Sequence, residues 1–358
     1  MDNIPKLRFP EFKGEWEEKR LGECLTLLYG KDWKDKSSTK KLYPVLGTGG
    51  VISYIDEFIY DKPCVLIGRK GSINNPVFID KPFWTVDTQF YSEIHEGYSP
   101  KFLYYIFCTE NWSKHDESTG VPSLSAKNVE NTHKHIPSYS EQQKIADFLS
   151  NVDSIITAET KILNTLQKKK KALMQKLFTQ QLRFKSADGT YFPAWEEKKL
   201  GECVISISSG KNKQKDSAGN YPVYGSMGII GYSEQYVYNK DCILVARVGV
   251  NAGTLHIAKG KYDVSDNTLI IELNENELLS FYYYLLVNIN LNKLNYGTGQ
   301  PLVTSGMLKN IDIQIPCKAE QQKIADCLSS MDSLIQTQQK VVTTCQQRKK
   351  ALLQQMFI

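Results

Sequence analysis

Two nearly identical stretches decide the fold: residues 141–178 read EQQKIADFLSNVDSIITAETKILNTLQKKKKALMQKLF, and residues 320–357 read EQQKIADCLSSMDSLIQTQQKVVTTCQQRKKALLQQMF. Twelve of their first sixteen residues are identical, and the copies begin 179 residues apart in a chain of 358. The units of solenoid proteins are much shorter than this. The repeat therefore predicts a duplicated domain, in which each half of the chain leads into one of the two stretches.

Apolar residues in both stretches recur in steps of three and four, and neither stretch contains Gly or Pro. This pattern predicts a long helix with one apolar seam. Polar residues interrupt the seams at equivalent places, Glu159 and Lys170 in the first and Gln338 and Lys349 in the second. The seam residues that we expect at a helix–helix or partner interface are Ile145, Leu149, Val152, Ile156, Leu163, Leu166 and Leu173, then Ile324, Leu328, Met331, Ile335, Val342 and Leu352.

A helix of this length needs a partner for its apolar stripe, because ~1.5 Å of rise per residue makes it roughly 57 Å long. We expect the two helices to pair antiparallel, with the two globular parts at opposite ends about a pseudo-twofold axis. The alternative is that each helix folds back on its own domain. The predicted class is α+β, with β-rich globular domains at 1–140 and 181–319 and long helices at 141–180 and 320–358.

Composition is ordinary for a soluble protein, and the localisation that we expect is cytoplasmic: 41% of residues are hydrophobic, 23% are charged, and no apolar run approaches the 18 residues of a membrane span. The first residues, MDNIPKLRFP, lack the apolar core of a signal peptide. A net charge of +5 is compatible with a polyanionic partner. The eight cysteines are dispersed, and Cys24 and Cys203 match between the halves, which favours small buried hydrophobes in a reducing compartment over a zinc site or disulfides.

Several scaffold features occur in both halves. The motif W-E-E-K-[KR]-L-G-E-C places Trp16 and Trp195 as aromatic anchors, with a ligand role as the less favoured alternative. The aromatic runs at 102–107 and 281–286 are expected to be core helices. Ile-Pro pairs end a strand before each long helix, and Ser140 with Gln143 predicts a capping box at the first helix start.

Each half also presents polar, glycine-bearing segments suited to a ligand. Lysine-rich loops at 30–41 and 210–220 precede the strands, and Arg69 and Arg247 each follow a continuous apolar strand and precede a glycine turn. An arginine there makes either a structural ion pair or a contact to phosphate or a guanine edge. Turns with the pattern T-G-x-P follow, and small residues let a backbone approach a ligand closely.

No catalytic constellation is present. The sequence lacks G-x-S-x-G, H-E-x-x-H, a Walker loop and the [DNS]-P-P-[YF] motif of amino-methyltransferases, and its closely spaced glycines do not match the dinucleotide fingerprint. His133 and His135 form a possible metal pair, although a polar loop is the commoner reading. The chain is therefore predicted to bind rather than to catalyse.

The tandem occurrence of [KR]-L-G-E-C, T-G-x-P, I-P and E-Q-Q-K-I-A-D resembles the specificity (S) subunit of type I restriction-modification enzymes over nearly the whole chain. The resemblance implies two target recognition domains separated by conserved spacer helices, which read an asymmetric, bipartite site in double-stranded DNA. It implies two methyltransferase (M) subunits for adenine methylation and restriction/translocase (R) subunits for cleavage of unmodified DNA. S-adenosylmethionine, ATP and Mg²⁺ would be used by those partners, so no cofactor and no metal is expected in this chain.

Under this reading, lysines of the loops are candidates for phosphate contacts, and residues at strand ends and turns are candidates for base edges. The DNA-binding candidates in the first half are Lys31, Lys34, Lys36, Arg69, Lys70, Gln89, Thr119 and Ser123. Those in the second half are Lys211, Lys213, Lys215, Arg247, Asn267, Thr298 and Gln300.

Two rival functions predict different behaviour. A self-contained restriction or modification enzyme would be active as the purified chain alone, whereas a structural dimerisation protein would not bind duplex DNA in a salt-dependent way. If the helices act as a ruler, four residues inserted into both would add ~6 Å of helix. The unread DNA spacer would then grow by about one or two base pairs with unchanged half-sites.

Overall fold

The computed structural model describes residues 4–212, 219–294 and 301–358, which form two compact units. Unit 1 comprises Met1–Lys161 and Lys340–Ile358, and unit 2 comprises Ile162–Gln339. The division falls inside both long helices, α4 (Tyr139–Phe178) and α7 (Lys318–Met356), so each unit contains the beginning of one helix and the end of the other. The α+β class is confirmed; the four-part division at 140, 180 and 319 remains a prediction.

Unit 1 contains nine strands and three short α-helices among its described residues. The strands are β1 (Glu17–Arg20), β2 (Leu25–Tyr29), β3 (Tyr43–Gly47), β4 (Gly50–Ile55), β5 (Cys64–Gly68), β6 (Val77–Ile79), β7 (Trp84–Thr85), β8 (Gln89–Ile94) and β9 (His133–Ile136). The helices are α1 (Leu21–Cys24), α2 (Pro100–Thr109) and α3 (Ala126–Glu130), with a 3₁₀ turn at Trp112–His115.

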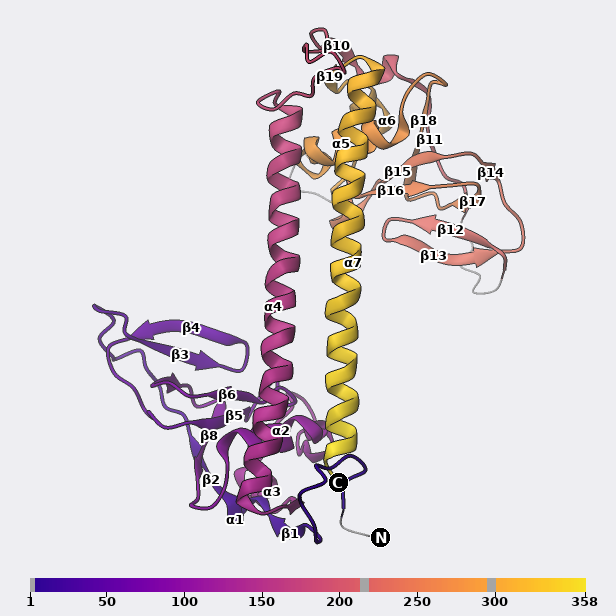
Figure 1. Cartoon of the computed structure of the whole chain (residues 1–358). Helices are drawn as coiled ribbons and strands as arrows, with labels where there is room; N and C mark the ends of the chain where they lie inside the picture. Colours follow the sequence, from indigo (N-terminus) through magenta and orange to yellow (C-terminus); the bar gives the residue numbers. More distant parts are fainter. Residues whose placement is uncertain (1–3, 213–218, 295–300) are drawn as a thin grey trace. The chain divides into compact units, whose positions relative to one another are not determined.

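The strands of unit 1 form two larger sheets and a two-stranded antiparallel sheet, β1-β9 (Figure 1). The larger sheet has the order β2-β8-β5-β6 with every pair antiparallel, and the smaller has the order β4-β3-β7. Strand β5 is buried at every position because its alternate residues serve different cores. Val65 and Ile67 pack with the aromatic residues of α2, whereas Cys64 and Leu66 pack with Phe83. The continuous apolar run in the sequence is thus the central, doubly covered strand.

Unit 2 repeats this arrangement with ten strands, two short α-helices and three 3₁₀ turns in the part that the structure describes. Its strands are β10 (Glu196–Lys199), β11 (Val204–Ser209), β12 (Tyr221–Gly225), β13 (Gly228–Ser233), β14 (Tyr238–Asn239), β15 (Cys242–Ala246), β16 (Leu255–Ala258), β17 (Lys261–Val264), β18 (Thr268–Leu273) and β19 (Asp312–Ile315). The helices are α5 (Leu279–Ile289) and α6 (Ser305–Lys309), and the 3₁₀ turns are η2 (Leu200–Glu202), η3 (Gly249–Asn251) and η4 (Leu291–Leu294).

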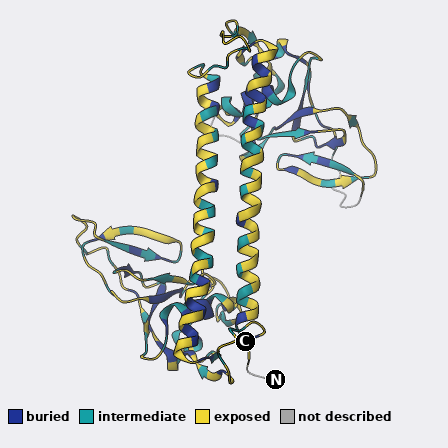
Figure 2. Cartoon of the chain, in the orientation of Figure 1, coloured by how far each residue is buried: buried dark blue, intermediate teal, exposed yellow. Residues whose placement is uncertain are grey.

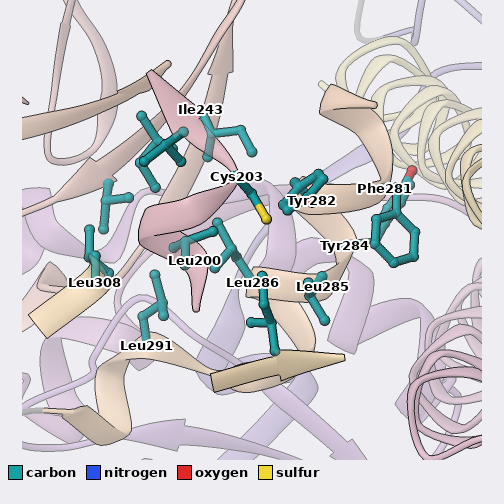
Figure 3. Close-up of a cluster of buried hydrophobic side chains, with 14 of the residues drawn as sticks. Leu200, Cys203, Ile243, Phe281, Tyr282, Tyr284, Leu285, Leu286, Leu291 and Leu308 are labelled. Carbon is teal, nitrogen blue, oxygen red and sulfur yellow. The ribbon is translucent and has the colours of Figure 1, made fainter. Parts of the chain in front are cut away.

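The sheet β11-β18-β15-β16 of unit 2 matches β2-β8-β5-β6, and β13-β12-β17-β14 matches the smaller sheet with one added strand. Cys203 lies in its main core among Leu200, Ile243 and Tyr282 (Figure 3). Cys24 has the equivalent place in unit 1, and burial raises the pKa of that thiol to about 11. The matched cysteines are therefore small buried hydrophobes, as predicted.

The start of each long helix is fixed by a buried carboxylate. Glu141 is 1% exposed and accepts two hydrogen bonds of 2.8 Å from the Arg8 guanidinium and one of 3.3 Å from Trp16 Nε1. Burial of a charge is tolerated because it is paired and hydrogen-bonded. The predicted anchor role of the tryptophan is confirmed, and the network explains why E-Q-Q-K and L-R-F occur together. Unit 2 has the same network with Glu320, Arg183 and Trp195.

The first helix begins at Tyr139, two residues earlier than predicted. Ser140 therefore lies within the first turn and is not its cap, and Gln143 Nε2 donates to the Tyr139 hydroxyl at 2.8 Å. The predicted capping box is wrong. Helix α7 likewise begins early, at Lys318.

Within each unit the two helix segments run antiparallel. In unit 1, Lys349 Nζ lies 2.5 Å from Asp153, while Met356, later in α7, shares a core with Leu149, earlier in α4. Lys170 pairs with Asp332 in unit 2 in the same way. A tyrosine of the neighbouring helix donates to each aspartate, Tyr105 at 2.8 Å and Tyr284 at 2.7 Å. The lysines that interrupt the seams thus form a repeated Lys–Asp–Tyr triad.

None of the predicted seam residues is fully exposed, and the strongest burial lies where each helix begins (Figure 2). Six of them are 6% exposed or less: Ile145, Leu149, Leu163, Ile324, Leu328 and Val342. The remaining seven are partly buried: Val152, Ile156, Leu166, Leu173, Met331, Ile335 and Leu352. Their role at a partner interface remains a prediction.

Candidate nucleic-acid interface

Four of the first-half candidates, Lys31, Arg69, Lys70 and Gln89, lie at one edge of the larger sheet of unit 1. Strands β2 and β5 both run antiparallel to β8, so both end where β8 begins. The chain leaves β2 towards Lys31, leaves β5 at Arg69 and enters β8 at Gln89. Backbone hydrogen bonds hold the three segments together, from Arg69 N to Thr88 O at 2.8 Å and from Gly30 N to Gln89 O at 3.2 Å. We call this region, Gly30–Lys31 with Arg69–Lys70 and Asp87–Gln89, the unit 1 edge.

A glycine allows the segments of the edge to approach. A Cβ atom on Gly30 would lie 2.0 Å from the carbonyl oxygen of Val86, and one on Gly210 would lie 2.3 Å from that of Ser265. Real side chains do not make such contacts, so only glycine fits at both positions. The glycine shared by the two lysine-rich loops therefore serves the fold.

The T-G-x-P turn docks on the same edge. Leu124 N donates to Arg69 O, and Gly71 N donates to Pro122 O, both at 2.9 Å. This brings Ser123 opposite Lys70. The loop is closed by Asp116, whose carboxylate accepts the backbone N–H of Ser123 at 2.9 Å. That bond, with two more from Ser118, lowers the pKa of Asp116. Thr119 lies exposed in this loop.

Arg69 is held by two neighbours. Its Nη1 donates to the carbonyl oxygen of Asp87 at 3.1 Å, and its Cζ lies 5.4 Å from the ring centroid of Tyr29. Tyr29 in turn packs edge-on against the buried ring of Phe90, with centroids 5.0 Å apart. Among the described residues the Nη2 group has no hydrogen-bond partner, and no carboxylate pairs with the guanidinium. The structural ion pair that was the alternative for Arg69 is thus not seen in the described chain.

The lysines of residues 31–41 differ in availability. Lys31 and Lys34 are exposed, whereas Lys36 pairs with Glu57 at 3.1 Å and lies 5.3 Å from the Trp84 ring centroid. The loop is ordered by Asp56, whose carboxylate accepts from Ser37 and from three successive backbone N–H groups at 39–41; these bonds lower its pKa. The loop thus has a backbone that Asp56 holds at 39–41 and exposes Lys31 and Lys34, as well as Lys40 and Lys41.

Gln89 differs from the expectation. Its side chain is 2% exposed, and its Oε1 accepts a 2.8 Å hydrogen bond from the hydroxyl of Thr85. The side chain thus lies within the fold and not on the surface expected of a base-reading group, and its role in DNA binding stays a prediction. The buried Thr85 partner lies four residues before it and gave no signal in the sequence.

Unit 2 has an equivalent edge with different side chains. Arg247 N donates to Asn267 O at 2.9 Å, and Val303 N donates to Arg247 O at 2.9 Å. Arg247 Nη1 contacts the Ser209 hydroxyl at 3.3 Å, and its buried Nε has no partner among the described residues. Lys211 and Asn267 are exposed. Four further candidates lie outside the described residues: Lys213, Lys215, Thr298 and Gln300.

Three residues at these edges were not among the candidates. Tyr29 and Ser209 each precede the shared glycine, and Asp116 closes the docked turn. The only sequence signal for Tyr29 and Ser209 is that the residue before a glycine shared by the two halves differs between them.

Other ligand classes have little support in the described chain. His133 and His135 lie on β9, and the described residues contain no group of three or more His, Cys, Asp or Glu side chains placed to hold a metal ion. Nor does any described helix have the length and apolarity needed to cross a bilayer.

Comparison with known proteins agrees with the duplication of the chain. The profile of the type I restriction modification DNA specificity domain matches residues 13–168 and again 194–344. The MjaVIII specificity subunit of Methanocaldococcus jannaschii is 28% identical, over 97% of this chain and 92% of its own length. The EcoprrI specificity subunit of Escherichia coli is 21% identical over 77% of this chain and 73% of its own.

Solved structures share the fold. The S subunit of a type I restriction-modification system from M. genitalium has a TM-score of 0.70 at 17% identity and covers 99% of both chains. A chain from a study of complex assembly and conformational transition in a type I system has a TM-score of 0.57 at 17% identity, covering 94% of this chain and 96% of its own. With two matching domains over most of its length, this chain belongs to the family of type I restriction-modification DNA specificity subunits.

Proposed function

We propose that the chain is the non-catalytic DNA-reading subunit of a type I restriction-modification complex, and that each unit reads one half of an asymmetric, bipartite site. The observation that carries this is the pair of equivalent sheet edges, built on repeated backbone contacts and furnished with different side chains. Two edges with the same backbone and different side chains suit the recognition of two different half-sites.

The edges have the chemistry for duplex DNA. Lysine ammonium groups can contact the phosphates, and the arginine guanidinium beside them can bind a guanine through two hydrogen bonds. Arg69 with Lys70 and Lys31 fills this role in unit 1, and Arg247 with Lys211 does so in unit 2. The phosphate contacts give affinity that falls with salt, whereas the arginines give sequence preference.

Partner subunits would supply the chemistry. Exposed apolar residues lie outside the seams, such as Phe148 (37% exposed) and Ile155 (53%) on α4 in unit 1 and Leu334 (54%) on α7 in unit 2. Ile155 and Leu334 are equivalent in the repeat, which suits two copies of one partner. We assign this surface to two methyltransferase subunits, which carry S-adenosylmethionine and flip the target adenine. Restriction subunits that use ATP and Mg²⁺ complete the complex.

Methylome sequencing of a host carrying this chain and its methyltransferase subunit tests the proposal. The expected result is one asymmetric motif with an unread spacer, which disappears when this chain is deleted. Methylation that persists without the chain, or activity of the purified chain alone, would contradict it. Insertion of four residues into both α4 and α7 should lengthen the unread spacer by about one or two base pairs and leave both half-sites unchanged.

A further inference from the structure

The residue that precedes the shared glycine lies beside the arginine in both units, although the two are far apart in the sequence. In unit 1 this residue is Tyr29, at the end of β2, beside Arg69 at the end of β5. In unit 2 it is Ser209, beside Arg247. Parallel alignment of β2 with β5, and of β11 with β15, produces the contact, each time across one intervening strand.

The two neighbours hold the arginine by different means. Tyr29 is 53% exposed and lies with its ring under the guanidinium, while the buried Phe90 packs against that ring in a T-shaped arrangement. An aromatic face orients a guanidinium without using its N–H donors, so those donors stay available in the plane of the group. Asp87 O occupies one donor on Nη1 and fixes the rotation of that plane.

Ser209 occupies a donor instead of stacking. Its hydroxyl contacts Arg247 Nη1 at 3.3 Å, and the neighbouring Nε is buried without a partner among the described residues. A buried N–H group without a partner is rare in a native protein and calls for an acceptor. The unit 2 arginine thus presents a different set of donors from that of unit 1.

We propose that Tyr29 and Ser209 are specificity-determining positioning residues: the first fixes Arg69 as a flat, bidentate donor for the O6/N7 edge of a guanine, and the second gives Arg247 a different donor geometry. The inference rests on the proposed function, because it assigns how two residues of that DNA interface select a base. It adds that a single exchange beside the arginine changes one position of one half-site.

Selection from a randomised duplex DNA library tests this, with the full chain and its methyltransferase subunits. Tyr29→Leu keeps an apolar strand residue and removes the aromatic face. It should reduce the preference for guanine at one position of one half-site about tenfold, since a good bidentate contact supplies discrimination of this order. The other half-site and binding to unrelated duplex should not change. Tyr29→Phe keeps the ring and should retain the wild-type preference.

The reciprocal exchange provides a second measurement if Tyr29→Leu fails to fold. Ser209→Tyr adds a ring in unit 2 and should change the base preference only in the other half-site, with Ser209→Ala as the control for loss of the hydroxyl alone. Folded variants that select the wild-type site at every position would overturn the inference. So would an equal loss of affinity for all duplexes. A wild-type complex that enriches no sequence would instead refute the proposed function itself.

Discussion

The surroundings of the two arginines that follow β5 and β15 differ more between the units than the strands themselves do. Arg69 lies against an exposed tyrosine ring and is followed by Lys70, whereas Arg247 contacts a serine hydroxyl and is followed by Val248. Yet both backbones bond to the residue before β8 or β18, and the carbonyl oxygens of both arginines accept a backbone hydrogen bond, from Leu124 N in unit 1 and from Val303 N in unit 2. The two halves thus share the backbone hydrogen bonds that build the edge. They differ in the side chains that project from it.

Side chains that hold the long helices behave in the opposite way. The networks Arg8–Glu141–Trp16 and Arg183–Glu320–Trp195 repeat with the same donor atoms and similar distances, although the tryptophan donates to Oε1 of Glu141 and to Oε2 of Glu320. Duplication followed by divergence preserves a contact when the loss of either partner leaves a buried charge unpaired. Substitutions at the helix starts and at the sheet edges should therefore have different effects.

The largest effect is expected from breaking a helix-start network. Arg8→Met leaves the carboxylate of Glu141, 1% exposed, without its cation. Removing one partner of a buried pair should lower the free energy of unfolding by about 3 kcal/mol. Arg183→Met should cost a similar amount in unit 2, measured by urea unfolding of each variant. Clearly unequal losses would show that the two networks are not equivalent in energy.

A smaller loss is expected at the triads, whose groups remain partly solvated. The side chains of Lys349 and Asp153 are 19% and 34% exposed. Lys349→Met keeps the apolar stem of the side chain, so it should destabilise unit 1 by about 1 kcal/mol. Lys170→Met is the matched variant in unit 2. Because the pairs are screened, the difference from wild type should shrink in high salt; a constant difference would argue against an electrostatic origin.

Much of this architecture follows from the sequence alone because the two halves of the chain can be compared with each other. Repeated apolar spacing predicts the helices, and the continuous apolar run before Arg69 predicts the central strand. The seam lysines, Lys170 and Lys349, read as interruptions because their partners lie on the other helix. The burial of Gln89 could not be read from the sequence because a polar residue at a strand end gives the same pattern whether it faces solvent or a buried hydroxyl.

Tyr29 was beyond sequence reasoning for a different reason. It lies 40 residues before Arg69, and only the antiparallel pairing of both strands with β8 brings the two together. No local pattern carries that information, since pairing across an intervening strand depends on the whole sheet. The sequence repeat thus predicts the shared strands and helices, whereas the three-dimensional structure is needed to show which residues meet at the sheet edges.

The neighbours Lys70 and Val248 offer a test of affinity separate from specificity. Lys70→Val gives unit 1 the unit 2 residue and removes one cation, so the slope of log K against log salt should fall by about 0.9 if that cation meets a phosphate. Sequence preference should not change. Val248→Lys should raise the slope by a similar amount, as measured by fluorescence anisotropy across a salt series. A change in the selected sequence would mean that Lys70 reads a base.

The smallest effect is expected at Asp116, which closes the docked turn of unit 1. Asp116→Ala removes acceptors for the N–H groups of Ser118 and Ser123. Since the carboxylate is solvated, stability should change little, and the result should be faster amide exchange at 117–123 with a few-fold weaker DNA binding. The lowered pKa of Asp116 gives an independent check. A carboxyl group with a lowered pKa stabilises the folded loop above its ordinary pKa, and that contribution is lost as pH falls through the folded value. Wild-type exchange at 117–123, corrected for its intrinsic pH dependence, should therefore accelerate in acid, whereas Asp116→Ala should show no such transition.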